Sequence, residues 1–182
     1  MRNIQDLRQA IDDGAHPGFL FFWGHRAPAR GVNQSCLSQW YPAPFTSGTC
    51  LYRTAEHFMM ARKAELFGDP ALAADIRVAP DPSGAKALGR RVRGFEESVW
   101  IRERFDIVVE GNVLKFGQNP ALKKFLLGTH DQVLVEASPL DAIWGIGLDA
   151  ETARVTPPAQ WRGENLLGFA LMEVRRRLLA RG

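Results

Sequence analysis

Most apolar residues of this chain recur at the three-to-four-residue spacing of an amphipathic helix. Ile4, Leu7 and Ile11 share one face between Asn3, a good cap, and Gly14. The same period continues through residues 96–116, which predicts one long helix. A final helix is predicted over residues 165–179, because Leu167, Leu171, Val174 and Leu178 lie on one face.

Cap and stop residues predict further helices between these. Thr54 precedes a helical segment that stops at Gly68, and Asp69-Pro70 opens another that extends to about Val78. Residues 83–91 form a third helical stretch, and Asn119-Pro120 starts a fourth that ends at Gly128.

Strand signals are few and short. The apolar run at residues 18–23 predicts a buried strand, residues 49–53 close a hairpin after a turn at 46–48, and residues 133–137 form another strand. Residues 138–163 are expected to be loop-like. The pattern therefore predicts a helix-rich α+β fold with a small number of short strands, in a single domain over residues 1–182.

Composition narrows the class of protein. The hydrophobic fraction is 46% and the charged fraction 24%, which are ordinary values for a globular protein and exclude a largely disordered one. The net charge of +3 is too mild to indicate nucleic-acid binding by itself.

The N-terminal segment lacks a continuous apolar stretch, so it does not predict a secretory signal. No apolar run approaches the ~20 residues of a membrane span, so no membrane association is expected. Cys36 and Cys50 form no Cys-x-x-Cys pair. We therefore expect a cytoplasmic protein.

Several common catalytic signatures are missing from the sequence. There is no Walker loop, and Gly145-Ile146-Gly147 lacks the third glycine and the strand–helix context of a dinucleotide site. The four histidines show no His-x-x-x-His spacing, so we expect no metal and no cofactor.

Charged residues within the predicted helices have ordinary explanations. Glu56 and Lys63 are seven residues apart and so lie on nearly one helical face, yet Glu56 also suits the positive end of a helix dipole and Lys63 a solvated surface. Lys115 likewise suits the end of its helix, Asn119 a cap and Trp100 a core position. Spacing alone favours these structural explanations.

The segment after the strand at 133–137 is more unusual. It contains Glu136, Asp141 and Trp144, followed by Gly145 and Gly147. Loops that follow strands often carry chemistry, and glycines allow a phosphate to approach the backbone. A Gly/Pro turn with a locally capping aspartate explains the segment equally well.

Together these segments resemble the YbiA/NADAR family of N-glycosidases over about residues 21–178. The family's elements occur here in order: Leu37-Ser38-Gln39-Trp40-Tyr41-Pro42, Thr54-Ala55-Glu56-His57 with Lys63, Ala85-Lys86-Ala87-Leu88-Gly89-Arg90, Trp100, and Lys115-Phe116-x-Gln118-Asn119. They continue with Val135-Glu136-Ala137-Ser138-Pro139-x-Asp141, Trp144-Gly145-x-Gly147 and Gly163-x-Asn165-x-x-Gly168. One departure is Ser38-Gln39-Trp40, where members often have Ser-Asn-Phe.

The resemblance implies an N-glycosidase that cleaves the bond between ribose C1 and an exocyclic amine, without metal or cofactor. Its substrate would be a small phosphoribosylamino-pyrimidine of riboflavin biosynthesis or, alternatively, ADP-ribose on guanine bases of nucleic acid. A third interpretation is a non-catalytic module that binds ADP-ribose. The sequence predicts no oligomeric state.

Site roles follow from the same resemblance. Lys63 is the predicted nucleophile, Lys115 the second choice, Glu56 the acid and base, and Asp141 orients ribose or water. The predicted substrate-binding residues are Lys86, Arg90, Trp100, Asn119, Glu136, Trp144, Gly145, Gly147 and Asn165. The mechanism is either a lysine Schiff base or direct attack by water on an oxocarbenium-like state. Glu56, Lys63, Trp100, Asp141 and Trp144 are expected to line one cleft.

Overall fold

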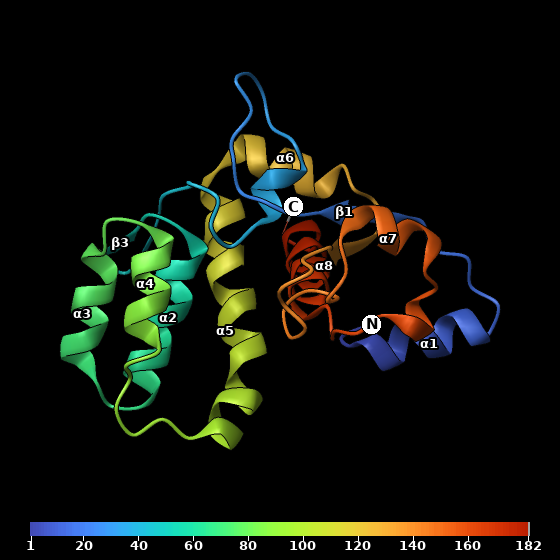
Figure 1. Cartoon of the computed structure of the whole chain (residues 1–182). Coiled ribbons are helices and arrows are strands. Elements are labelled where there is room, and N and C mark those ends of the chain that lie inside the picture. The colour runs from blue at the N-terminus through green and yellow to red at the C-terminus, as the bar shows by residue number, and fades with distance from the viewer. Residues whose placement is uncertain (182) are drawn as a thin grey trace. The chain divides into compact units, whose positions relative to one another are not determined.

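A computed structural model describes residues 1–181, and these form two compact units (Figure 1). Unit 1 combines residues 1–38 with the chain from Ala121 onward, and unit 2 is Gln39–Pro120. The polypeptide therefore leaves the first unit, builds the second and returns.

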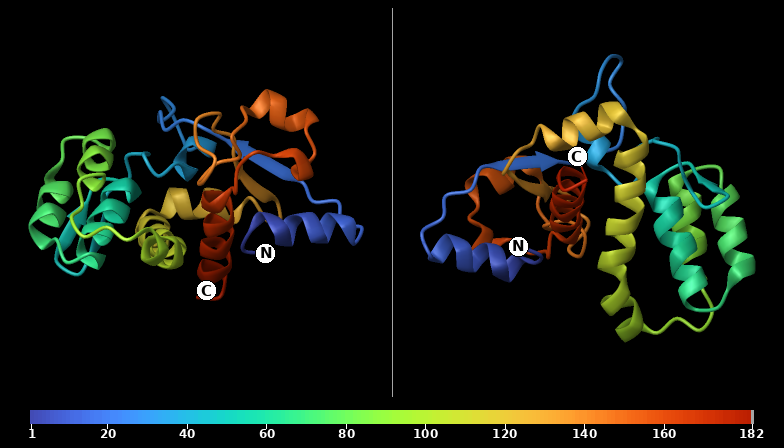
Figure 2. Two further views of the ribbon diagram at one scale, coloured as in Figure 1. Left: turned by 60° about the horizontal axis from the view of Figure 1, so that its bottom comes forward. Right: turned by 180° about the vertical axis from the view of Figure 1, so that it is seen from behind.

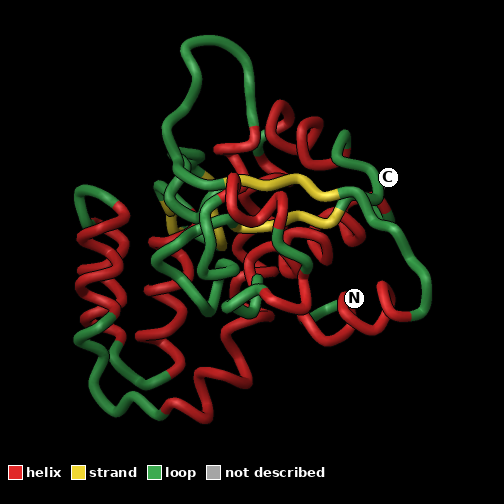
Figure 3. The backbone as a smooth tube through the Cα atoms, turned by 45° about the vertical axis from the view of Figure 1, so that its right-hand side comes forward, coloured by secondary structure: helices red, strands yellow, loops and turns green. Residues whose placement is uncertain are grey.

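Unit 1 is built on a pair of parallel strands, which Figure 3 shows side by side. Strand β1 (Phe19–Phe22) pairs with β4 (Val133–Glu136) in the register Phe19–Val133 to Phe22–Glu136. Helix α8 (Leu166–Leu179) packs on β4. Gly168 permits this approach, because a Cβ atom there would collide with the Leu134 carbonyl oxygen. The strand ends are thus held against a helix.

Shorter elements complete unit 1. They are α1 (Ile4–Asp12), η1 (Gln34–Leu37), α6 (Pro120–Leu127), which begins at the unit boundary, α7 (Ala150–Val155) and η2 (Pro158–Gln160). The expectation that residues 138–163 are loop-like is wrong for α7 and η2. Asp149 caps α7 by accepting the Thr152 N–H at 2.9 Å, but six residues are too few to show a helical period in the sequence.

Unit 2 is mainly helical (Figures 1 and 2). Helix α2 (Ala55–Leu66) packs against α3 (Pro70–Val78), α4 (Pro82–Gly89) and α5 (Glu97–Gln118). A hairpin of β2 (Phe45–Ser47) and β3 (Cys50–Tyr52) adds Phe45 and Tyr52 to the ring of Phe58 in the core. A Cβ atom on Gly111 would lie 2.6 Å from the Phe58 ring, so α5 needs a glycine there to approach α2.

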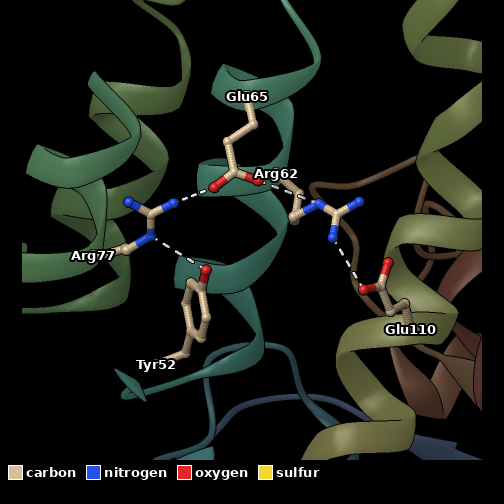
Figure 4. Close-up of polar contacts among 5 residues, drawn as sticks. All are labelled: Tyr52, Arg62, Glu65, Arg77 and Glu110. Carbon is tan, nitrogen blue, oxygen red and sulfur yellow. Dashed lines mark hydrogen bonds and ion pairs between the residues drawn. The ribbon is translucent and has the colours of Figure 1, made fainter. Parts of the chain in front are cut away.

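A series of polar contacts joins four elements of unit 2 (Figure 4). Arg77 donates to the Tyr52 hydroxyl at 3.2 Å and also pairs with Glu65. Glu65 contacts Arg62, which in turn pairs with Glu110 at 3.0 Å. The contacts link β3, α3, α2 and α5. Burial raises the pKa of the Tyr52 hydroxyl above its ordinary value.

The predicted fold class is confirmed: the fold is helix-rich α+β with few, short strands. The predicted helices and strands are present, with ends that differ by one or two residues. The turn predicted at residues 46–48 is wrong, because Thr46 and Ser47 belong to strand β2. The chain turns at Gly48 and Thr49, where the positive φ of Gly48 allows a tight two-residue connection. That residues 1–182 form a single domain stays a prediction. Within residues 1–181, no helix is long and apolar enough to cross a membrane.

Candidate active site

The N-terminal end of α2 is buried and held by an extensive set of hydrogen bonds. The Thr54 hydroxyl accepts the His57 backbone N–H, which caps the helix. His57 Nε2 donates to the Ala79 carbonyl at 3.2 Å, and the Thr54 hydroxyl then donates to Nδ1 at 2.8 Å. Burial lowers the pKa of His57 and keeps the ring neutral. The first turn of α2, which carries Glu56, is thus fixed in place.

Gln39 links the buried Glu56 of α2 to the buried Asn112 of α5. Glu56 is 3% exposed, and its backbone N–H donates to the Gln39 carbonyl at 3.0 Å. Asn112 donates from Nδ2 to the Gln39 side chain at 2.7 Å. Lys115 follows one turn later on α5 and is 0% exposed, with its amine 5.9 Å from the Tyr41 ring centre. Fully buried Glu and Lys are rare and often functional.

Lys63 lies at the other end of α2 in a different environment. Its amine donates to the Gly89 carbonyl at 3.0 Å and lies 4.2 Å from the Phe95 ring centre and 5.6 Å from that of Trp100. The side chain is half-buried, and burial lowers the pKa of the amine below its ordinary value. A larger fraction of the Lys63 amine is therefore neutral, and so nucleophilic, at neutral pH.

Glu56 and Lys63 share the helical face that their spacing predicts. Seven residues of α-helix span roughly 10 Å along the axis, so the two groups are neighbours on one side of a site rather than a direct pair. A substrate or a water molecule is needed to link them.

The C-terminal end of α4 contributes further basic residues. The Lys86 amine lies 5.8 Å from the Trp40 ring centre, and Arg90, which follows Gly89, is exposed. Asn119 donates from Nδ2 to the Lys115 carbonyl at 2.8 Å and to the Pro44 carbonyl at 3.1 Å. Asn119 thereby ties the end of α5 to the segment before β2.

In unit 1, the segment after β4 is tightly folded on itself. One carboxylate oxygen of Asp141 accepts the N–H groups of Ile143 and Trp144 at 2.9 and 2.8 Å. The N–H groups of Ile146 and Gly147 donate to the carbonyls of Glu136 and Asp141. Asp141 therefore makes the local turn that its sequence context suggested, and two backbone donors of the glycine loop are already engaged.

Asn165 and Gly145 have structural explanations as well. Asn165 is 0% exposed; it accepts the Glu136 N–H at 3.0 Å and donates to the Leu134 carbonyl at 2.9 Å. A Cβ atom on Gly145 would lie 2.8 Å from the Glu136 carbonyl oxygen. These residues position Glu136 at the end of β4, and direct substrate contacts by Asn165, Gly145 and Gly147 stay predictions.

No group of three or more His, Cys, Asp or Glu side chains within residues 1–181 is arranged to hold a metal ion. Neither Cys36 nor Cys50 forms a disulfide bond.

A family model for the NADAR domain matches residues 21–179. The chain belongs to the NADAR domain family. It is 46% identical over 162 residues to N-glycosidase R617 of Acanthamoeba polyphaga mimivirus, and the match covers 86% of this chain and 94% of that protein. It is also 35% identical over 133 residues to the chloroplastic riboflavin biosynthesis protein PYRR of Zea mays, of which it covers 20%.

The solved structure of E. coli YbiA has a similar fold, with a TM-score of 0.72 over 92% of this chain and 88% of that one. At 24% identity, this similarity supports the fold alone. The predicted YbiA/NADAR resemblance is confirmed, and so is the prediction of an enzyme of the N-glycosidase class, at the level of the family.

Within this NADAR domain, unit 2 brings several predicted residues together. Lys63 lies beside Trp100, and Glu56 occupies the same face of α2. Asp141 and Trp144 belong to unit 1. That they line one cleft with Glu56, Lys63 and Trp100 stays a prediction, as do the individual catalytic and binding roles.

Sequence reasoning gave no site role to Gln39, Asn112 or Phe95. Asn112 carried a signal, because an asparagine between Val108, Val109 and Val113 interrupts an apolar helix. Gln39 lay inside a family motif but departed from the usual asparagine. Phe95 carried no periodic signal, since it precedes α5 in a connecting segment.

Proposed function

We propose that this NADAR-family chain hydrolyses the bond between ribose C1 and an exocyclic amine in a phosphoribosylamino-pyrimidine. The observation that carries the proposal is the Lys63 amine, which is half-buried beside two aromatic rings. Its pKa is lowered, and it lies on the same helical face as the buried Glu56. A nucleophilic amine and a carboxylate are the two groups that a Schiff-base N-glycosidase needs.

The proposed reaction begins when the glycosylamine opens its ring to an imine, with the ring oxygen becoming a hydroxyl. The neutral Lys63 amine adds to C1, and a proton delivered by Glu56 allows the base to leave as an amine. The resulting lysine Schiff base takes up water, which returns the free lysine and releases the sugar aldehyde. Asp141 would orient the ribose or the water.

Direct attack by water remains the alternative route. In that route Glu56 stabilises an oxocarbenium-like C1 and no covalent bond to lysine forms. Lys115, fully buried on α5, is the second candidate for a covalent intermediate.

Borohydride trapping separates these routes. Incubation with substrate and borohydride should add one ribosyl phosphate mass, and peptide mapping should place the adduct on Lys63. Lys63→Ala should abolish it, and Lys124→Ala, which alters an exposed lysine on α6, should not. An adduct mapped to Lys115 would reassign the nucleophile, and hydrolysis without any adduct would favour direct attack by water.

The names of the relatives support the substrate class, because R617 is named an N-glycosidase and PYRR a riboflavin biosynthesis protein. The alternative substrate, ADP-ribose on guanine in nucleic acid, draws support from the exposed residues Arg90 and Arg91 beside Gly89, which accepts the Lys63 hydrogen bond. Parallel assays with both substrates decide between them. Activity on a nucleic-acid substrate should also fall steeply with salt.

A further inference from the structure

Phe95 is a large apolar side chain that unit 2 leaves open to solvent. It lies in the short connection between α4 and α5 and is 44% exposed. One side of its ring nevertheless lies 4.2 Å from the Lys63 amine, measured to the ring centre. The ring is therefore both open to solvent and in contact with the amine of the proposed nucleophile.

The surrounding chain holds this ring in position. The neighbouring Arg93 makes a two-pronged contact with Asp69, with both nitrogen–oxygen distances 3.1 Å. The Asp69 side chain is nearly buried, and Arg93 lowers the pKa of its carboxyl. Gly94 then turns the chain with φ +65°, and Phe67 packs edge-on against Phe95 with ring centres 5.2 Å apart. The Arg93–Asp69 contact and the packing of Phe67 therefore hold Phe95 in place.

The Trp100 ring centre lies 5.6 Å from the same amine, and the Gly89 carbonyl accepts a hydrogen bond from that amine. A carbon that bonds to this amine carries its leaving group only a few bond lengths away. A planar leaving base at that distance is within reach of both rings, where offset or edge-on aromatic contacts are favourable.

We propose that Phe95 is a specificity-determining residue whose ring, together with Trp100, forms the wall that the planar leaving base of the substrate contacts. The proposal rests on the proposed function through the role of Lys63. The new claim is that Phe95 contacts the base of the substrate directly and so discriminates between substrates with different bases. A purely structural role of Phe95, in stabilising the fold, is the alternative.

The first experiment measures binding and needs no turnover. Isothermal calorimetry would determine the Kd of the protein for a diaminohydroxypyrimidine, used as the free base. Phe95→Ala should weaken binding roughly tenfold, as expected for loss of one aromatic–base contact, and Phe95→Trp should restore it. Val78→Ala, which alters an exposed apolar residue on α3, should leave Kd unchanged.

The second experiment asks whether Lys63 still works in the same variant. Ribose 5-phosphate carries no base, and its aldehyde condenses with an amine to an imine and water; borohydride then reduces the imine. Wild type and Phe95→Ala should both form this adduct at Lys63. Because the Phe95 ring also contributes to burial of the amine, the rates are compared at a pH high enough for the amine to be neutral in both proteins, where they should lie within about twofold of each other.

The outcomes separate the two proposals. Weaker base binding with unchanged trapping supports the role of Phe95. Equal Kd values for wild type and Phe95→Ala, or no base binding by the wild type, overturn it, whatever the trapping shows. Absence of a ribose 5-phosphate adduct at Lys63 in the wild type argues against the proposed nucleophile, while the Kd comparison still decides the role of Phe95.

Discussion

The two ends of α2 face different environments, although they belong to one helix. At the N-terminal end, Glu56 and His57 are buried, and neighbouring groups fix the histidine ring and the helix start. At the C-terminal end, Lys63 is half-buried and lies among aromatic rings, while Arg62 and Glu65 make exposed ion pairs. The N-terminal end of α2 is therefore buried and held in place, whereas the C-terminal end is accessible to a ligand.

This difference shows how one helix can have a stable, buried end and an accessible, nucleophilic side chain at its other end. A buried polar group is costly unless it is hydrogen-bonded, so the N-terminal end depends on the hydrogen bonds that Thr54, His57 and Gln39 make there and tolerates little change. A reagent that bonds to substrate has to be reachable, so Lys63 is desolvated without being sealed off. Substitutions at the two ends should therefore differ in kind: those at Lys63 should change catalysis with little effect on stability, whereas those around Glu56 and His57 should also lower stability.

The largest expected effect is catalytic and belongs to the open end. Lys63→Ala should lower kcat/KM for N-glycoside hydrolysis by about 10³-fold or more, because a covalent nucleophile is lost. Its free energy of unfolding should change by only about 1 kcal/mol, the typical contribution of the single hydrogen bond to Gly89. Steady-state kinetics and urea unfolding on the same protein measure both. A large loss of stability with little loss of rate would mean that Lys63 has a structural role rather than a catalytic one.

The next effect is on stability and belongs to the packed side of α2. Gly111→Ala places a methyl group 2.6 Å from the Phe58 ring, which should destabilise the fold by about 1–3 kcal/mol. Gly89→Ala is the matched change near Lys63, where the methyl would meet the flexible Met60 side chain. Urea midpoints should fall further for Gly111→Ala, and an equal fall would mean that the two ends are packed alike.

The pH dependence of stability tests the buried histidine. Burial lowers the pKa of His57, so the unfolded chain binds the proton more tightly than the folded chain. The free energy of unfolding should therefore decrease as pH falls from about 6.5 toward the lower pKa of the folded state. His57→Gln should flatten this slope, and His16→Gln, which alters an exposed histidine, should not. A slope unchanged by His57→Gln would show that other groups cause it.

The smallest effect is expected for the exposed ion pairs of Figure 4. Arg62→Ala removes contacts to Glu65 and Glu110, whose side chains are more than a third exposed. Such pairs contribute about 0–1 kcal/mol, and salt screens them. Thermal unfolding at low and high salt should show a small difference that disappears at high salt. A decrease of several kcal/mol in the free energy of unfolding would show that these ion pairs stabilise the fold as strongly as the buried contacts do.

Much of the fold could be predicted from the sequence because its signals are local. Thr54 and Asp69 cap their helices as their residue types indicate, and Gly68 ends α2 in a left-handed conformation. The strands were recognisable as short apolar runs, but their parallel pairing was not, since β1 and β4 are more than 100 residues apart in the chain. Helix α7 was missed because it is too short to show a period.

The candidate site likewise has features that the sequence predicts and features that depend on tertiary structure. The sequence by itself determined the fold class, most helix ends and, through motif order, the family and the identities of Glu56, Lys63 and Trp100 as candidates. Only the tertiary structure decided that Lys63 is desolvated between Phe95 and Trp100, that Asn112 meets Gln39, and that Asn165 serves the backbone of β4. The physical reason is that caps and periods depend on near neighbours, whereas desolvation and side-chain pairing depend on segments that only folding brings together.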